Sequence, residues 1–119
     1  MNPLPVKGQL LSGMAQGAGQ ASMEYLIIDA NGHVLTGSFM DYAMPRASDL
    51  IRVNSLSHCV PTPTNTFGVK GVGESGAVGA LPAVMNAIND ALASAGADRV
   101  DMPATPKRIW HALQRTRGL

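Results

Sequence analysis

The sequence contains little of what would mark a secreted, membrane or nucleic-acid-binding protein. Its 119 residues include one cysteine, Cys59, so no disulfide can form within the chain, and this usage is typical of a reducing compartment. No apolar run approaches the about 20 residues that a membrane-spanning helix needs, and the start lacks the charged and apolar regions of a signal peptide. The formal net charge is only +1, which gives no sign of a nucleic-acid partner or an anionic membrane. We therefore expect a soluble, cytoplasmic protein.

Aromatic residues are also scarce, at 4% of the chain, whereas glycine and proline are plentiful, with 13 and 8 residues. This balance favours tight turns and close approaches of the backbone over a core of large side chains. The length allows one small domain at most, or a piece of a larger one.

The first expected helix covers residues 6–23, where Leu10, Met14 and Ala18 recur at fourfold spacing. Three glycines in this stretch each cost roughly 1 kcal/mol relative to alanine in a helix; they are Gly13, Gly17 and Gly19. Such a helix is easier to explain if another element packs closely against its backbone.

Strand-like patterns follow in the middle of the chain. Residues 24–29 and 33–39 flank Ala30-Asn31-Gly32, whose Asn-Gly pair is typical of a hairpin with a primed turn. Residues 53–60 read as a further short strand, ended by the proline-rich residues 61–65.

The clearest helical face comes later, with apolar residues at i, i+3, i+4, i+7 and i+11: Leu81, Val84, Met85, Ile88 and Leu92. We expect Pro82 in the first turn or two of this helix, and Gly96 as its stop. Thr105 as N-cap and Pro106 as first helical residue predict another helix. The fold class expected is α+β, with helices packed on a small mixed or antiparallel sheet.

Between these elements, Gly71, Gly73 and Gly76 spell the pattern GxGxxG. A dinucleotide-binding loop should follow a buried strand and lead to an acidic residue at a strand end about 20 residues later. Neither condition is met, because a polar, proline-rich stretch precedes the loop and the next acids, Asp90 and Asp98, fall in or just after a helix. The pattern does not indicate a dinucleotide fold.

A single carboxylate, Glu74, lies inside this glycine run, at or just before the start of a helix, where the helix dipole favours a negative charge. Two interpretations remain open from spacing alone: a structural helix cap, or an unshielded base for proton abstraction. Lys70 and Gln16 likewise fit either solvated surface residues or ligand-binding ones. No histidine or cysteine pair has metal-ligand spacing, so no protein-ligated metal site is expected.

Several blocks of the sequence together resemble one family. Residues 15–20 (AQGAGQ), 40–45 (MDYAMP), 68–76 (GVKGVGESG) and 102–110 (MPATPKRIW) occur in the order seen at the C-terminal end of molybdenum hydroxylase large subunits. This is the family of xanthine dehydrogenase, aldehyde oxidase and aerobic carbon monoxide dehydrogenase. The resemblance extends from about residue 2 to about residue 113.

The resemblance implies roles for individual residues. Glu74 matches the catalytic base of the family, which takes a proton from a molybdenum-bound hydroxyl as that group attacks an electron-poor carbon. Gln16 matches a glutamine that contacts the pterin cofactor. The remaining implied cofactor-binding residues form the glycine-rich wall beside the pterin: Lys70, Gly71, Val72 and Gly73. The metal is held by the dithiolene of the cofactor, so no side chain ligates it.

The resemblance also implies the surroundings. Residues 1–119 would be the C-terminal portion of a molybdopterin-binding domain, with the rest of the molybdenum subunit supplied elsewhere. The cofactor would be molybdopterin in its cytosine dinucleotide form, with iron–sulfur clusters and FAD on partner subunits. The substrate would be an aldehyde, an N-heterocycle or carbon monoxide. Alone, the chain is expected to bind no cofactor and to be inactive.

The alternative from a different class is a non-catalytic fragment that acts as a small docking module. Cut from a parent subunit, the helices would expose apolar side chains such as Leu10, Met14, Val84 and Ile88, so self-association of the isolated chain is expected.

Overall fold

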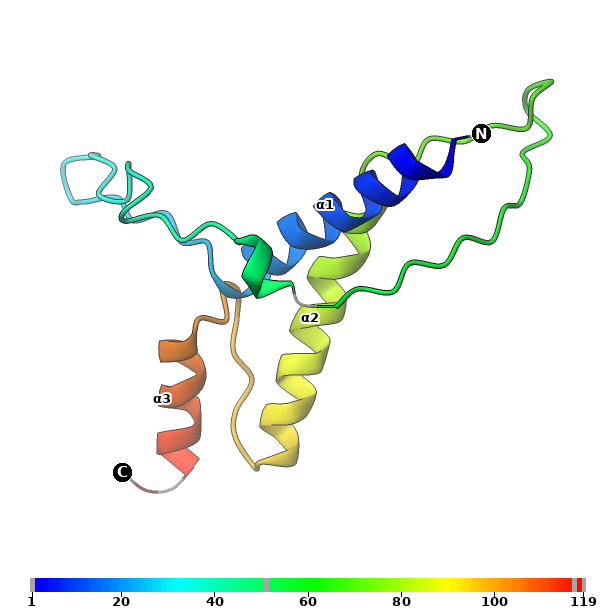
Figure 1. Ribbon diagram of the computed structural model, residues 1–119. Helices are drawn as coiled ribbons and strands as arrows, with labels where there is room; N and C mark the ends of the chain where they lie inside the picture. The colour runs from blue at the N-terminus through cyan, green and yellow to red at the C-terminus, as the bar shows by residue number, and fades with distance from the viewer. Residues whose placement is uncertain (1, 51, 117, 119) are drawn as a thin grey trace.

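The protein is built from helices joined by long irregular segments (Figure 1). The computed structural model describes residues 2–50, 52–116 and 118. Over these residues it contains the α-helices α1 (Pro3–Ser22), α2 (Ser75–Ser94) and α3 (Pro106–Thr116), with a short 3-10 helix, η1 (Ala47–Asp49). Helices α1 and α2 cross at the centre, α3 lies beside the lower half of α2, and the segments 24–46 and 52–74 extend to opposite sides as two arms.

The expected first helix is confirmed, and the structure supplies a reason for its glycines. Asn2 caps α1, since its side-chain oxygen accepts a hydrogen bond from the Leu4 N–H at 3.1 Å. Gly13 and Gly17 both face α2: a Cβ added to either would lie 2.8 Å from a backbone atom of Ala77. The two helices thus approach through their backbones, as the cost of the glycines suggested.

The predicted small sheet is not formed, so the α+β prediction is wrong in its β part. Within the described ranges the hairpin amounts to a single bridge between Ile28 and Val34, with the Leu35 N–H donating to the Ile27 carbonyl at 2.8 Å. Residues 53–60 are extended but pair with no neighbouring strand. A two-stranded ribbon without a third strand or a covering helix is marginally stable, which explains why the β pattern did not produce a sheet.

The hairpin turn also differs from the expected primed type. A primed turn of type I′ needs positive φ at both central residues, but here Gly32 alone has it, with φ 85°, while Asn31 does not. The Gly32 N–H donates to the Asp29 carbonyl at 3.1 Å, and the Asp29 N–H donates to the His33 carbonyl at 2.9 Å. The connection is therefore a three-residue loop with a glycine bulge.

Helix α2 begins earlier than its apolar face indicated, and this changes the place of Pro82. The helix starts at Ser75, so Pro82 lies in its interior, not in the first turn or two. There its missing N–H leaves the Val78 carbonyl without its usual intrahelical partner. The glycine-rich residues before the apolar face carry no helical apolar pattern, so the sequence did not indicate that α2 starts at Ser75.

Both helix-end predictions are confirmed. Gly96 has φ 73°, and the N–H groups of Gly96 and Ala97 donate to the carbonyls of Ala93 and Leu92 at 2.9 and 2.8 Å, which is a Schellman motif. Thr105 precedes α3, and its hydroxyl oxygen accepts from the Arg108 N–H at 3.4 Å.

The chain exposes far more surface than a compact protein of its mass. Its accessible surface is 9112 Å², whereas a compact monomer of this size exposes roughly 6,100 Å². The radius of gyration is 18.2 Å, against roughly 13–14 Å for a compact domain of this length. The buried apolar side chains among the described residues are few: Ala21, Leu92, Ala104 and Ala112.

Candidate functional site

Glu74 occupies the N-cap position of α2 but does not act as a cap. Its backbone has φ −108° and ψ 3°, and its side chain makes no capping hydrogen bond. The turn before it is closed by the Ser75 N–H donating to the Val72 carbonyl at 3.2 Å, and the Val78 N–H donates to the Glu74 carbonyl at 3.1 Å. The carboxylate is exposed at the end of an ordered turn, free to meet a group outside this chain.

The glycines on either side of Glu74 divide into two kinds. A Cβ on Gly76 would lie 2.5 Å from the Leu10 carbonyl oxygen, so packing against α1 explains that glycine. A Cβ on Gly71 or Gly73 would meet nothing within 4 Å, and neither residue has positive φ. Contacts and backbone conformation within this chain therefore give no reason for Gly71 and Gly73.

The other residues of the predicted wall lie in the same extended stretch. Lys70 is exposed, Val72 is half-buried, and among the described side chains Lys70 and Glu74 form no ion pair. Lys70 therefore does not neutralise Glu74, and both charged groups remain open to a ligand.

Gln16 lies on α1, close to the helix crossing. It precedes Gly17, whose added Cβ would lie 2.9 Å from the Ala80 side chain, and its own side chain is exposed. Gln16 is thus within about one helical turn of the α1–α2 contact. Glu74 directly precedes the first turn of α2, which meets α1 at Gly76, so Gln16 and Glu74 each lie beside the contact between the two helices.

The side chain of Asn65 clamps the backbone just before Lys70, a feature that was not predicted from the sequence. The amide of Asn65 donates to the Val69 carbonyl at 3.0 Å, and its oxygen accepts from the Val69 N–H at 3.1 Å. Gly68, between them, has φ 64°, and its N–H donates to the Asn65 carbonyl at 3.1 Å. An asparagine three residues before a glycine is typical of a β-turn, and this signal would have indicated the turn from Asn65 to Gly68.

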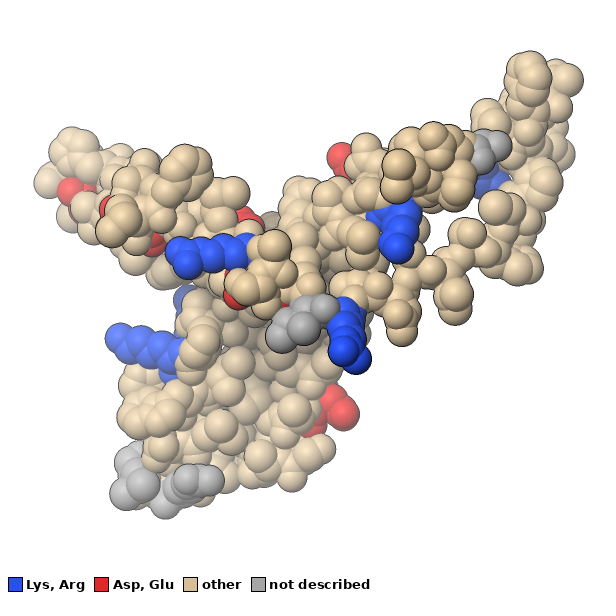
Figure 2. Space-filling view, viewed as in Figure 1, with Lys and Arg blue, Asp and Glu red and all other residues tan. Residues whose placement is uncertain are grey.

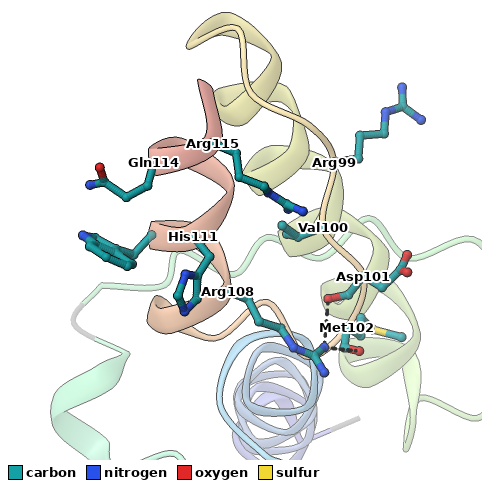
Figure 3. A pocket seen from close by; sticks show the side chains of 9 residues that line it. Arg99, Val100, Asp101, Met102, Arg108, His111, Gln114 and Arg115 are labelled. Carbon is teal, nitrogen blue, oxygen red and sulfur yellow. Dashed lines mark hydrogen bonds between the residues drawn. The ribbon is translucent and has the colours of Figure 1, made fainter. Parts of the chain in front are cut away.

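A broad, open hollow of about 1090 Å³ lies elsewhere, between α3 and the segment 99–102 (Figure 3). Arg108 crosses its floor, where one guanidinium nitrogen donates to the carbonyls of Met102 and Pro103 at 3.0 and 3.2 Å. None of the residues expected in the functional site lines this hollow. Arg108 therefore holds the backbone before α3.

Two features are absent from the described residues. No group of three or more histidine, cysteine, aspartate or glutamate side chains gathers there in a way that could hold a metal ion. Likewise, none of the described helices is both long and apolar enough to cross a membrane.

Comparisons with known proteins agree with the sequence motifs. Residues 1–51 match the family model of the molybdopterin cofactor-binding domain. Over 115 residues the chain is 39% identical to the nicotine 6-hydroxylase large subunit of Paenarthrobacter nicotinovorans, covering 96% of this chain and 14% of that subunit.

Solved structures give the same result for the fold. A crystal structure of the Cu,Mo-CO dehydrogenase superposes with a TM-score of 0.88 at 34% identity, over 96% of this chain and 14% of that chain. Quinoline 2-oxidoreductase from Pseudomonas putida 86 superposes with a TM-score of 0.83 at 40% identity, over 95% of this chain and 14% of that one.

In fold and sequence the chain is thus similar to one segment of the large subunits of molybdenum enzymes. It is similar to a segment of the molybdenum hydroxylases, among them the carbon monoxide dehydrogenase large chains and the xanthine dehydrogenase molybdenum-binding subunits. The chain spans about 14% of the length of the relatives that it matches.

Proposed function

We propose that this chain forms the C-terminal portion of the molybdopterin-binding domain of a molybdenum-dependent oxidoreductase. In this proposal Glu74 is the catalytic base, and the residues beside the cofactor are Gln16, Lys70, Gly71, Val72 and Gly73.

The single observation that carries the proposal is that nothing within the chain explains why positions 71 and 73 are glycines: Gly71 and Gly73 both face open space. A Cβ on either glycine would enter open space, and neither needs glycine for its φ. Glycines in such a place are explained if a group outside the chain approaches the backbone closely. A flat, rigid cofactor lying along residues 70–73 would be such a group, and the free carboxylate of Glu74 would follow directly beside it.

The surface of the chain supports its assembly with the remainder of a larger subunit. Its accessible area exceeds that of a compact monomer by roughly 3,000 Å², whereas each partner in a standard protein interface buries only about 800 Å². Large apolar side chains are strongly exposed, among them Leu56 at 95%, Phe67 at 89% and Phe39 at 87%. Most of the face seen in Figure 2 is neither basic nor acidic, as expected of a surface that packs against protein.

The residues of this chain would have a limited set of tasks. When bound, the molybdenum cofactor supplies the redox chemistry, and the protein supplies placement and electrostatics. The backbone of residues 70–73 would set the distance to the cofactor, and Gln16 would orient it through amide hydrogen bonds. A carboxylate oxygen of Glu74 would accept the proton released by the attacking nucleophile, a step that typically contributes about 10²–10⁴-fold to a rate.

The remaining details of the proposal follow the family. The substrate is an aldehyde, an N-heterocycle or carbon monoxide, and the cofactor is the cytosine dinucleotide form of molybdopterin. Electrons leave through iron–sulfur clusters and FAD on partner subunits. The single, unpaired Cys59 is in keeping with a cytoplasmic location.

The test is the variant Glu74→Gln in the assembled enzyme that contains this chain. We expect turnover to fall by about 10²–10⁴-fold with the molybdenum content nearly unchanged, because the amide keeps the shape but cannot accept the proton. Asp90→Asn, an exposed acid on the same helix, is the matched control and should leave turnover unchanged. Normal turnover in Glu74→Gln, or loss of molybdenum, would contradict the role of base.

The other candidate, a non-catalytic docking module, makes a different prediction for the same assembly. If removal of this chain from the assembled enzyme leaves both molybdenum content and turnover intact, the chain is a docking module and supplies no base.

A further inference from the structure

We propose that the backbone contact between α1 and α2 is a positioning device for Glu74, with Gly76 and Gly13 as its positioning residues. This inference rests on the proposed function, because it assigns to the two glycines the placement of the base.

The contact at Gly76 is between backbones, so neither side can yield by turning a side chain. A Cβ added to Gly76 would lie 2.5 Å from the Leu10 carbonyl oxygen, 2.9 Å from the Met14 nitrogen and 3.1 Å from the Gly13 carbonyl carbon. All three atoms belong to the backbone of α1. An ordinary van der Waals contact at a Cβ is 3.4–4 Å, so any larger residue at position 76 must push the two helices apart.

The partner glycines on α1 meet α2 in the same way. A Cβ on Gly13 would lie 2.8 Å from the Ala77 nitrogen and 3.0 Å from the Gly76 Cα. A Cβ on Gly17, one turn later, would lie 2.8 Å from the Ala77 carbonyl oxygen and 3.0 Å from the Leu81 nitrogen. The first turns of α2 are therefore held by two successive turns of α1, which fixes both the separation and the register of the helices.

Glu74 belongs to the turn that this contact holds. It precedes Gly76 by two residues, and its carbonyl accepts the Val78 N–H at 3.1 Å, so it moves with the first turn of α2. Its side chain has no hydrogen bond of its own to keep it in place at the N-cap. The position of the carboxylate therefore depends on where α1 holds the start of α2.

The distances indicate how far Glu74 would move. Relieving the contact of 2.5 Å at Gly76 to the ordinary lower limit of 3.4 Å requires a shift of 3.4 − 2.5 = 0.9 Å. A misplacement of about 1 Å at a reacting group can reduce a rate by about 10²-fold.

The chain offers a matched control on each helix. A Cβ on Gly79 of α2 or on Gly8 of α1 would meet nothing within 4 Å, so alanine at these positions changes helix propensity without touching the crossing. The experiment compares Gly76→Ala with Gly79→Ala, and Gly13→Ala with Gly8→Ala, in the assembled enzyme. It measures kcat, KM, the pH dependence of kcat, the molybdenum content and a crystal structure of Gly76→Ala.

We expect Gly76→Ala and Gly13→Ala to retain molybdenum and to lower kcat by about 10–10²-fold with a smaller change in KM. The acid limb of their kcat profile should shift, and the first turn of α2 should be displaced by about 1 Å; both controls should resemble the wild type. If Gly76→Ala and Gly13→Ala match their controls in kcat and in pH profile, the proposal is overturned. Loss of molybdenum or of the folded subunit in both crossing variants would make the contact structural, and would overturn it as well.

Failure of the proposed function is a separate result. It would appear as normal turnover in Glu74→Gln. Failure of the positioning role would appear as an inactive Glu74→Gln beside fully active crossing variants.

Discussion

The hydroxyl of Tyr42 donates a hydrogen bond of 2.7 Å to the carboxylate oxygen Oε2 of Glu24. The two residues are 18 positions apart, and the bond ties the far part of the arm 24–46 to its first residue, Glu24. The N–H of Glu24 in turn donates to the Gly19 carbonyl of α1 at 2.9 Å. Gly19 lies beneath the same junction, since a Cβ there would collide with the ring of Pro45 and come within 2.8 Å of Glu24 Oε1. The residues of the MDYAMP block thus fasten one arm of the protein onto α1.

This contact predicts the titration of Tyr42. The hydrogen bond to the Glu24 carboxylate raises the pKa of the Tyr42 phenol above its ordinary value of 10.0. Because the folded-state pKa is raised, the contribution of the contact is fully present below pH 10.0 and is lost as the pH rises through the folded-state pKa. A carbon-13 NMR titration of Tyr42 should show the raised pKa, and Glu24→Gln should bring the pKa of Tyr42 closer to its ordinary value. An unchanged titration in Glu24→Gln would contradict the assignment.

Asp29 predicts a pH dependence of the opposite sign, at the acid end. Hydrogen bonds to its carboxylate, above all from the His33 N–H, lower the pKa of Asp29 below its ordinary value of 3.8. The carboxylate also accepts the Asn31 N–H at 2.8 Å, so the ionised form holds the turn together. A lowered folded-state pKa means that this contribution is present above pH 3.8 and is lost as the pH falls through the folded-state pKa.

The measurement for Asp29 is the pH dependence of the amide protons of Asn31 and His33, followed by NMR below pH 5. Both signals should move together as the turn loosens. Asp29→Asn keeps an oxygen that can accept both N–H groups but cannot titrate, so it should abolish the pH dependence. If the dependence persists in Asp29→Asn, another group controls the turn.

Features that depend on a few neighbouring residues could be predicted from the sequence. The stop at Gly96 and the cap at Thr105 are local, and the structure confirms both of them. The close packing expected against the glycines of α1 is confirmed as well. The sheet failed as a prediction because strands depend on distant partners, and residues 53–60 find none among the described residues. Pro82 was misplaced because the glycine-rich start of α2 carries no apolar pattern.

The residues of the candidate site were predicted from the family motifs, because their spacing and chemistry alone did not single them out. Spacing alone could not decide whether Glu74 is a helix cap or a base. In the structure the side chain of Glu74 makes no capping hydrogen bond. That α2 is the element packed against Gly13 could not have been predicted, because the contact joins helices more than fifty positions apart through backbone atoms. The roles of Gln16 and of residues 70–73 remain predictions.

The end of α2 gives a stability prediction that rests on one dihedral angle. Gly96 has φ 73°, a conformation that costs an alanine roughly 1–2 kcal/mol. A Cβ there would meet only the Thr116 methyl group at 3.7 Å, an ordinary contact, so the loss would come from the backbone and not from a clash. We therefore expect Gly96→Ala to lower the free energy of unfolding by about 1–2 kcal/mol.

Two further variants separate this backbone effect from a general response to substitution. Gly79→Ala, in the open part of the same helix, should be neutral or stabilising by up to about 1 kcal/mol, because alanine is the better helix former. Gly96→Asn should fall between Gly96→Ala and the wild type, since asparagine tolerates the left-handed conformation better than alanine does. Denaturant unfolding of the chain, followed by circular dichroism, measures all three variants. A Gly96→Ala protein as stable as Gly79→Ala would show that the Schellman motif does not hold the end of α2.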